Sequence, residues 1–161
     1  MRPVRRWLSP TIAVVCIVMM RWGGYAAIHA VAGGAAFCAA SGASAQQFVI
    51  YCAGNCLALA AMLLFRVRGK RGVKDSAFLT AVFAAAAYIG AQLGRGIAGL
   101  FFGGTPAAAL LFFTTDSLSL LFAIVVVLIS RRADGLFEDQ RDYLIRMQEE
   151  SRRRQNEEYY K

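Results

Sequence analysis

Formal charges are almost absent from two long stretches of this chain, and that absence restricts the possible folds more than any other feature. Residues 26–65 contain no Asp, Glu, Lys or Arg, and residues 75–130 contain only Asp75, Arg95 and Asp116. The chain is 58% hydrophobic with a mean hydropathy of +0.48, which is more apolar than a typical soluble domain. A bilayer core of about 30 Å is crossed by roughly 20 mostly apolar helical residues. The sequence therefore predicts an integral membrane protein.

The apolar runs predict an all-α fold, a bundle of four transmembrane helices within residues 1–132. Three spans are expected at 46–65, 76–101 and 107–130. Each run is continuous rather than alternating, so it is unlike a strand of a membrane barrel. The turn sequence GGTP at 103–106 combines glycines that tolerate positive φ with a proline suited to a helix start. The last two spans should therefore form an antiparallel hairpin.

The first 45 residues allow two registers for one further crossing. A span near 8–30 would contain Arg21, whereas a span near 23–41 would follow an interfacial helix. A cleaved secretory signal is a weaker alternative, because the run before the small-residue sequence CAASGASA is longer than a typical signal peptide.

Basic residues lie next to the spans, and their placement predicts the orientation. With four spans, the loop 66–74, the pair 131–132 and the basic N-terminal residues all fall on one side of the membrane. Lys and Arg concentrate in cytoplasmic loops and near anionic lipid headgroups. We therefore expect both termini in the cytoplasm, most simply at a bacterial inner membrane, and no nucleic-acid partner. The candidate headgroup contacts are Arg66, Arg68, Lys70, Arg71 and Lys74.

The C-terminal segment 133–161 is the only part that resembles a soluble protein. Residues 131–161 carry eight basic and eight acidic side chains, so the net charge of +8 belongs to the rest of the chain. Leu136, Tyr143, Leu144 and Met147 recur near helical spacing. We expect a charged cytoplasmic helix, which either binds a partner through complementary charges or is simply solvated.

Arg95 and Asp116 are the two charges expected inside the membrane. In a hairpin that turns at 103–106, Arg95 faces a position two residues before Asp116, a difference of roughly 3 Å along a helix. An unpaired charge in a bilayer costs at least about 2.5–3.5 kcal/mol. We therefore predict an Arg95–Asp116 ion pair, which either fixes the hairpin or forms a polar pocket for a lipid headgroup, an ion or a quinone. The candidate pocket residues are Gln92, Thr115, Ser119 and His29.

Small residues in the third span indicate close helix packing. Gly90 with Gly94, and Gly99 with Gly103, are spaced four apart, and such pairs let helix backbones approach closely. The pair Cys52 and Cys56 lacks a second pair that would complete a metal site. We therefore expect no metal or other cofactor, and no catalytic set is visible.

Residues 94–132 resemble the C-terminal half of a family of small four-helix bacterial membrane proteins of unestablished function. In that pattern a Gly-Arg precedes a Gly/Pro turn, an acidic residue follows in mid-helix, and a basic pair closes the last span. The family has Glu where this chain has Asp116, and it lacks the charged tail. The resemblance implies four helices and the Arg–acid pair, and it implies no activity. The matching residues are Gly94, Arg95, Gly104, Pro106, Asp116, Arg131 and Arg132.

These features predict a non-enzymatic accessory or assembly subunit of a larger membrane complex, in contact with membrane lipids and with other membrane protein subunits. Packing would use the Ala/Gly-rich helices and the charged tail. Two alternatives remain open: a small transporter or channel or lipid/quinone-binding protein that uses the Arg95–Asp116 site, and a membrane sensor that signals through the tail.

Overall fold

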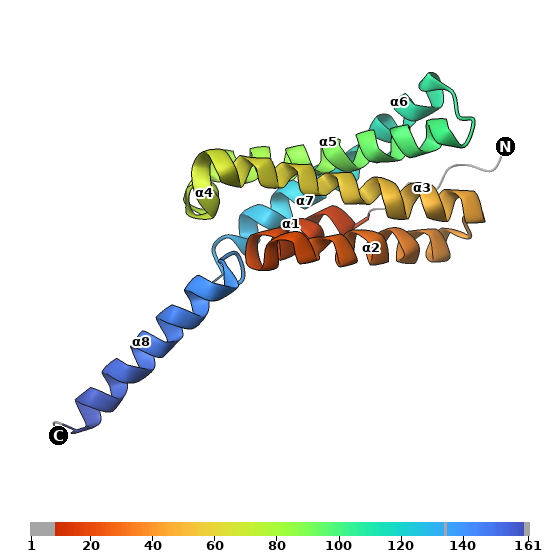
Figure 1. Cartoon of the computed structure of the whole chain (residues 1–161). Coiled ribbons are helices and arrows are strands. Elements are labelled where there is room, and N and C mark those ends of the chain that lie inside the picture. Colours follow the sequence, from red (N-terminus) through yellow and green to blue (C-terminus); the bar gives the residue numbers. More distant parts are fainter. Residues whose placement is uncertain (1–8, 134, 160–161) are drawn as a thin grey trace.

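The computed structural model describes residues 9–133 and 135–159, and the regular elements within them are all helical (Figure 1). Most of the helices lie side by side in an elongated bundle, and α8 projects from one end of it. The elements are α1 (Thr11–Trp22), the 3₁₀ turn η1 (Gly23–Tyr25), α2 (Ala26–Ser41), α3 (Ala45–Asn55), the 3₁₀ segment η2 (Cys56–Met62), α4 (Leu63–Asp75), α5 (Ala77–Phe101), α6 (Pro106–Thr115), α7 (Ser117–Ser130) and α8 (Gln140–Tyr159).

Three helical stretches are long and apolar enough to cross a membrane, namely Thr11–Ser41, Ala45–Asp75 and Ala77–Phe101. The pair Pro106–Thr114 and Ser117–Ser130, bent by 45°, makes a fourth if it is counted as one broken span. The fold is therefore an all-helical bundle with three to four apolar helices of membrane-spanning length, which agrees with the predicted fold class at that level.

The first of these stretches is not one straight rod, because the chain reverses at Gly23. This glycine has φ +60°, outside the helical range. Thr11 and Gly33 would lie about 33 Å apart in a straight helix. Instead they touch, since a Cβ on Gly33 would lie 2.4 Å from Thr11 Cγ2. Helices α1 and α2 therefore form an antiparallel pair, as their many mutual contacts also show.

Helix α1 lies in the interior of the bundle, packed against α2, α5 and α7. Most of its side chains, from Ile12 to Met20, are buried. Helix α2 falls within the stretch 23–41 of one expected register, and the helix before it is a core element of the bundle. The expected cytoplasmic N-terminus with Arg2, Arg5 and Arg6 lies outside the described residues.

Glycines of α5 bring it into backbone contact with α3 and η2. A Cβ added to Gly94 would lie 2.1 Å from the carbonyl oxygen of Gly54, and one on Gly90 would lie 2.5 Å from that of Leu57. Both glycines serve the close packing expected of them. The other expected pair differs: Gly99 makes only ordinary contact, and Gly103, with φ +79°, belongs to the turn before α6.

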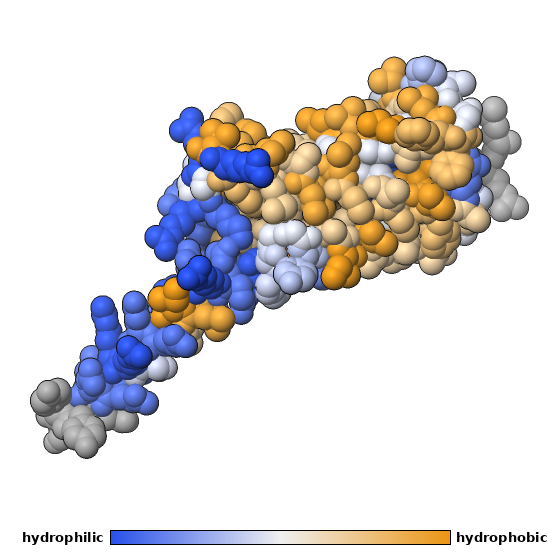
Figure 2. Space-filling view, viewed as in Figure 1, coloured by the Kyte–Doolittle hydropathy of each residue, from blue (hydrophilic) through white to orange (hydrophobic). Residues whose placement is uncertain are grey.

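The surface of the bundle is strongly polarised along its length. Figure 2 shows that the visible side of the bundle is largely hydrophobic, whereas hydrophilic residues gather at the end where α4 meets α8. Large apolar side chains are exposed on the bundle, among them Leu93, Ile97 and Leu121. Contiguous exposed apolar surface of this kind is rare on soluble proteins. An apolar solvent around the bundle removes that difficulty.

Gly94→Ala should destabilise the bundle by about 1–3 kcal/mol, because the new methyl group would force α3 away from α5. Gly99→Ala is the matched control, since its methyl group would meet its nearest neighbour at 3.8 Å and Ala favours a helix over Gly. Unfolding by SDS in mixed micelles, followed by circular dichroism, measures both. Equal stability of the two variants would contradict the backbone contact.

Candidate functional site

Arg95 is the most deeply buried charge in the described structure, with a relative exposure of 3%. Its Nε donates to Asn55 Oδ1 at 2.9 Å. Its Nη1 donates to Gln92 Oε1 at 3.1 Å and to Asp116 Oδ2 at 3.0 Å. The ring of Tyr51 lies against the guanidinium, 4.4 Å from Cζ to the ring centroid. We call these five residues the arginine cluster.

The carboxylate of Asp116 is held from both sides. Oδ2 also accepts a hydrogen bond from Gln92 Nε2 at 3.2 Å, while Oδ1 accepts one from the hydroxyl of Ser119. The Ser119 Oγ in turn accepts from the backbone N–H of Ser9 at 3.0 Å. Asp116 stands at the break between α6 and α7. The carboxylate therefore lies near the N-terminus of α7, where the helix dipole favours negative charge.

The cluster joins helices that are distant in sequence. Asn55, at the end of α3, donates from Nδ2 to the carbonyl oxygen of Ala30 in α2 at 3.1 Å. Tyr51 stacks on Phe37 of α2 at 5.1 Å and meets the edge of Phe112 of α6 at 6.0 Å. Elements α2, α3, α5 and the α6–α7 break therefore all contribute to the surroundings of one guanidinium.

The geometry of the cluster supports a role in holding the helices together more than a role in binding or converting a ligand. Among the described residues, none of its buried side-chain nitrogen or oxygen atoms lacks a hydrogen-bond partner. The Asp116 side chain is only 16% exposed and already accepts from three side chains. Breaking a buried ion pair by removing one partner leaves an uncompensated charge. The polar groups of the cluster therefore hold one another in place through mutual hydrogen bonds.

The structure brings together four of the predicted site residues, namely Arg95, Asp116, Gln92 and Ser119. His29 does not join them. It lines a groove of about 480 Å³ between α1 and α2, whose other lining residues are mostly apolar. The side chain of Thr115 lies outside the part of the chain that the structure describes.

Asn55, Tyr51 and Ser9 contribute to this site, although the sequence analysis did not single them out. A signal existed for Asn55, because it is the only amide residue between Gln47 and Arg66. Tyr51 lies one turn earlier and so shares its helix face. The contribution of Ser9 depends on the reversal at Gly23, which the sequence analysis did not identify.

A second polar site fastens the base of α8 to the bundle. Phe137 is fully buried in the hydrophobic core just before α8 begins. Arg21, at the end of α1, donates to Gln140 Oε1 at 2.6 Å and to the carbonyl oxygen of Gly135. Its guanidinium also lies 5.1 Å from the ring of Tyr143. One apolar anchor and one arginine therefore fix the direction in which α8 leaves the bundle.

Ion pairs between α4 and the α8 segment complete this junction. Lys70 pairs with Asp139, Lys74 with Glu138 at 3.8 Å, and Arg71 with Asp142 at 3.2 Å. Three of the five expected headgroup residues thus face acids of the same chain. The positive φ of Gly69, +68°, bends α4 so that these side chains turn toward α8. The other two, Arg66 and Arg68, are exposed and make no ion pair within the described residues.

Asp139 responds to this environment. Partial burial raises the pKa of its carboxyl group, but the hydrogen bond from Lys70 and the backbone N–H of Arg141 lower it more, so the net pKa lies below its ordinary value of 3.8. A depressed carboxyl pKa means that the folded, docked state prefers the ionised form. The stability that ionised Asp139 adds to the docked state is therefore fully present above pH 3.8. It is lost as the pH falls through the lowered pKa of this carboxyl group.

The fold and these two sites define an all-helical bundle with membrane-type apolar helices, an internally satisfied charge cluster and a docked charged helix. Comparisons with protein-family models, with curated proteins and with solved structures find no match. The resemblance seen in residues 94–132 therefore stays a prediction.

Asp116→Asn should destabilise the bundle by about 3 kcal/mol, because it leaves the Arg95 guanidinium buried without a counter-charge. Arg95→Gln in the same background should recover part of the loss. A double-mutant cycle on the free energy of unfolding should give a coupling energy of about 1 kcal/mol or more. Strict additivity of the two changes would show that the ion pair contributes nothing.

Acidification should release the base of α8. A nitroxide attached at position 148, beyond the ion pairs, should become more mobile as the pH falls from 7 through the lowered pKa of Asp139. That pKa lies below 3.8, the ordinary value for this carboxyl group. Asp139→Asn should increase the mobility already at pH 7, because the partner of Lys70 is then neutral. A label whose mobility ignores both changes would mean that Phe137 and Arg21 hold the junction alone.

Proposed function

We propose that the chain is an integral membrane protein with four crossings, made by α2, by α3 to α4, by α5 and by α6 to α7. Helix α1 is then a half-length helix enclosed by the others. The end that carries α4 and α8 holds most of the basic residues of the described bundle, which supports a cytoplasmic location for that end. A bacterial inner membrane is the setting that we expect.

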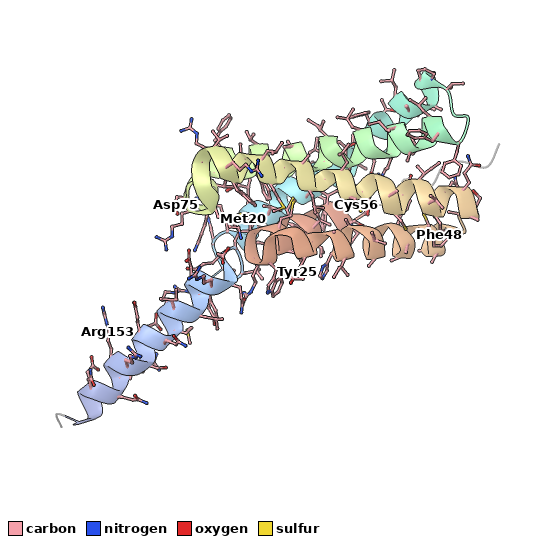
Figure 3. All side chains as sticks on the ribbon, viewed as in Figure 1. Met20, Tyr25, Phe48, Cys56, Asp75 and Arg153 are labelled. Atoms are coloured by element: carbon pink, nitrogen blue, oxygen red, sulfur yellow. The ribbon has the colours of Figure 1, made fainter. Side chains whose placement is uncertain are left out.

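We further propose that it is a non-enzymatic accessory subunit, which presents α8 to another subunit of a membrane complex. The observation that carries this proposal is the contrast along α8. Its base is held by Phe137, Arg21 and three ion pairs with α4. Its remainder leaves the bundle, as the position of Arg153 shows in Figure 3. A helix held so firmly at one end and solvated beyond it has a defined direction in which to meet a partner.

The outer face of α8 carries apolar side chains that the bundle does not cover. Leu144 is 51% exposed and Ile145 is 47% exposed. Leu144 lies roughly opposite Asp142 and Arg146 around the helix, because successive residues are separated by about 100°, whereas Ile145 lies about 60° from Asp142. Apolar residues surrounded by charge are typical of the centre of a protein interface with its polar rim.

The transporter alternative finds less support. A transport or proton site needs a group that can exchange partners with a substrate, whereas the Asp116 carboxylate and the Nε and Nη1 atoms of Arg95 already have partners within the bundle. His29 lines a groove whose lining includes none of the five residues of the arginine cluster.

The partner can be tested by gentle detergent extraction of the tagged protein from its native membrane, followed by quantitative mass spectrometry. We expect one membrane complex at a near-stoichiometric ratio. Leu144→Ser with Ile145→Ser should reduce its recovery by at least about tenfold, a loss of roughly 1.4 kcal/mol or more in binding.

Val67→Ser is the matched control, since Val67 is also an exposed apolar residue at this end of the bundle but lies on α4. It should leave recovery unchanged. A wild-type protein that runs as a lone homo-oligomer, with no foreign subunit, would contradict the accessory role and favour transport.

A further inference from the structure

A groove of about 490 Å³ opens on the side of the bundle, at the end where α5 begins and α7 finishes. Val125, Leu128 and Ile129 of α7 provide an apolar wall along its length, and Ala77 of α5 faces them. Arg131 and Arg132 stand at its end. Val125 and Ile129 are exposed, so the groove opens toward the medium that surrounds the bundle.

The Arg131 side chain is only partly used by the protein. Its Nη2 donates to the carbonyl oxygen of Asp75 at 3.4 Å, a long hydrogen bond. Its Nη1 is buried and has no hydrogen-bond partner among the described residues. Neither Arg131 nor Arg132 forms an ion pair with any described carboxylate, in contrast to the basic residues of α4. The partly buried Arg131 and the exposed Arg132 therefore carry positive charge that no described carboxylate offsets, and an anion in the groove would offset it.

We propose that this groove binds one anionic phospholipid. Its phosphate would accept hydrogen bonds from Arg131 and Arg132, and an acyl chain would lie along Val125, Leu128 and Ile129. The apolar wall from Val125 to the arginines extends for roughly 10 Å along the helix. An amphiphile with a negative headgroup and an apolar tail therefore matches the groove, because its headgroup can meet the arginines while its tail lies along the apolar wall. A zwitterionic lipid fits less well, because its own cation would lie near two guanidinium groups.

The proposal places the headgroup contact away from the 66–74 loop, where the sequence analysis expected it. Lys70, Arg71 and Lys74 already face the acids of the α8 segment. Unpaired Arg66 also borders an apolar groove, of about 500 Å³, but the only other basic residue there, Lys70, is paired with Asp139. The groove at the end of α7 is bordered by two arginines without ion pairs to described carboxylates. The site depends on the bundle lying in a membrane, but it does not depend on the partner proposed for α8, so each proposal can fail separately.

The test is the thermal stability of the purified protein in an uncharged detergent, with added dioleoyl phosphatidylglycerol or dioleoyl phosphatidylcholine. Phosphatidylglycerol should raise Tm clearly more than phosphatidylcholine does. In the Arg131→Gln/Arg132→Gln protein this difference should disappear, or the phosphatidylglycerol concentration for half the shift should rise about tenfold. Arg152→Gln/Arg153→Gln is the control, because it removes the same charge from the projecting part of α8 and should keep the full shift.

Two further arms make the outcome decisive. Inorganic phosphate alone should not reproduce the shift, and an equal shift would show a free-anion site and overturn the lipid assignment. Val125→Trp with Ile129→Trp fills the groove while keeping both arginines, and it should abolish the preference for phosphatidylglycerol even if the arginine variant unfolds. A preference that survives in this variant, or that is lost equally in the α8 control, overturns the site.

Discussion

The structure depends on the burial of one guanidinium group. Arg95 keeps its charge inside the bundle, so the fold must supply acceptors where it removes water. Those acceptors come from different elements: Asn55 from α3, Gln92 from α5, and Asp116 from the α6–α7 break. Apolar helices in an apolar solvent gain little from one particular register over another. The hydrogen bonds to Arg95 therefore specify how far each helix is displaced along its neighbours.

Two features of the backbone place hydrogen-bond acceptors around Arg95. Gly54 and Gly94 let α3 approach α5 so closely that a Cβ on Gly54 would lie 2.5 Å from the backbone nitrogen of Arg95, and this approach puts Asn55 within reach of the guanidinium. On the other side, α6 ends and α7 begins at Asp116. A continuous helix would commit the backbone there to i→i+4 hydrogen bonds, whereas the break places the carboxylate at a helix N-terminus. The close helix packing and the helix break therefore both bring hydrogen-bond acceptors to the Arg95 guanidinium.

Much of this was predictable because the relevant signals are local or nearly so. The long apolar helical stretches, the turn at 103–106 and the approach of Arg95 to Asp116 all follow from apolar runs and the geometry of one hairpin. One expected register allowed a break before residue 23, but the reversal there was not predicted, since it depends on contacts between α1 and α2 such as that of Thr11 with Gly33. Asn55 and the pairing of α4 with the α8 segment were also missed. They depend on contacts between residues far apart in sequence, which no periodicity reports.

The basic residues at the α4/α8 end illustrate why net charge is a poor guide to partners. Lys70, Arg71 and Lys74 are neutralised by the same chain, and they serve the orientation of α8. Arg131, at the end of α7, keeps an N–H group that no described residue accepts. The two sets lie at one end of the bundle, but one set faces the acids at the base of α8 and the other borders an apolar groove. Their functions therefore follow from what surrounds each charge, and the cluster around Arg95 shows the same rule in the interior of the bundle.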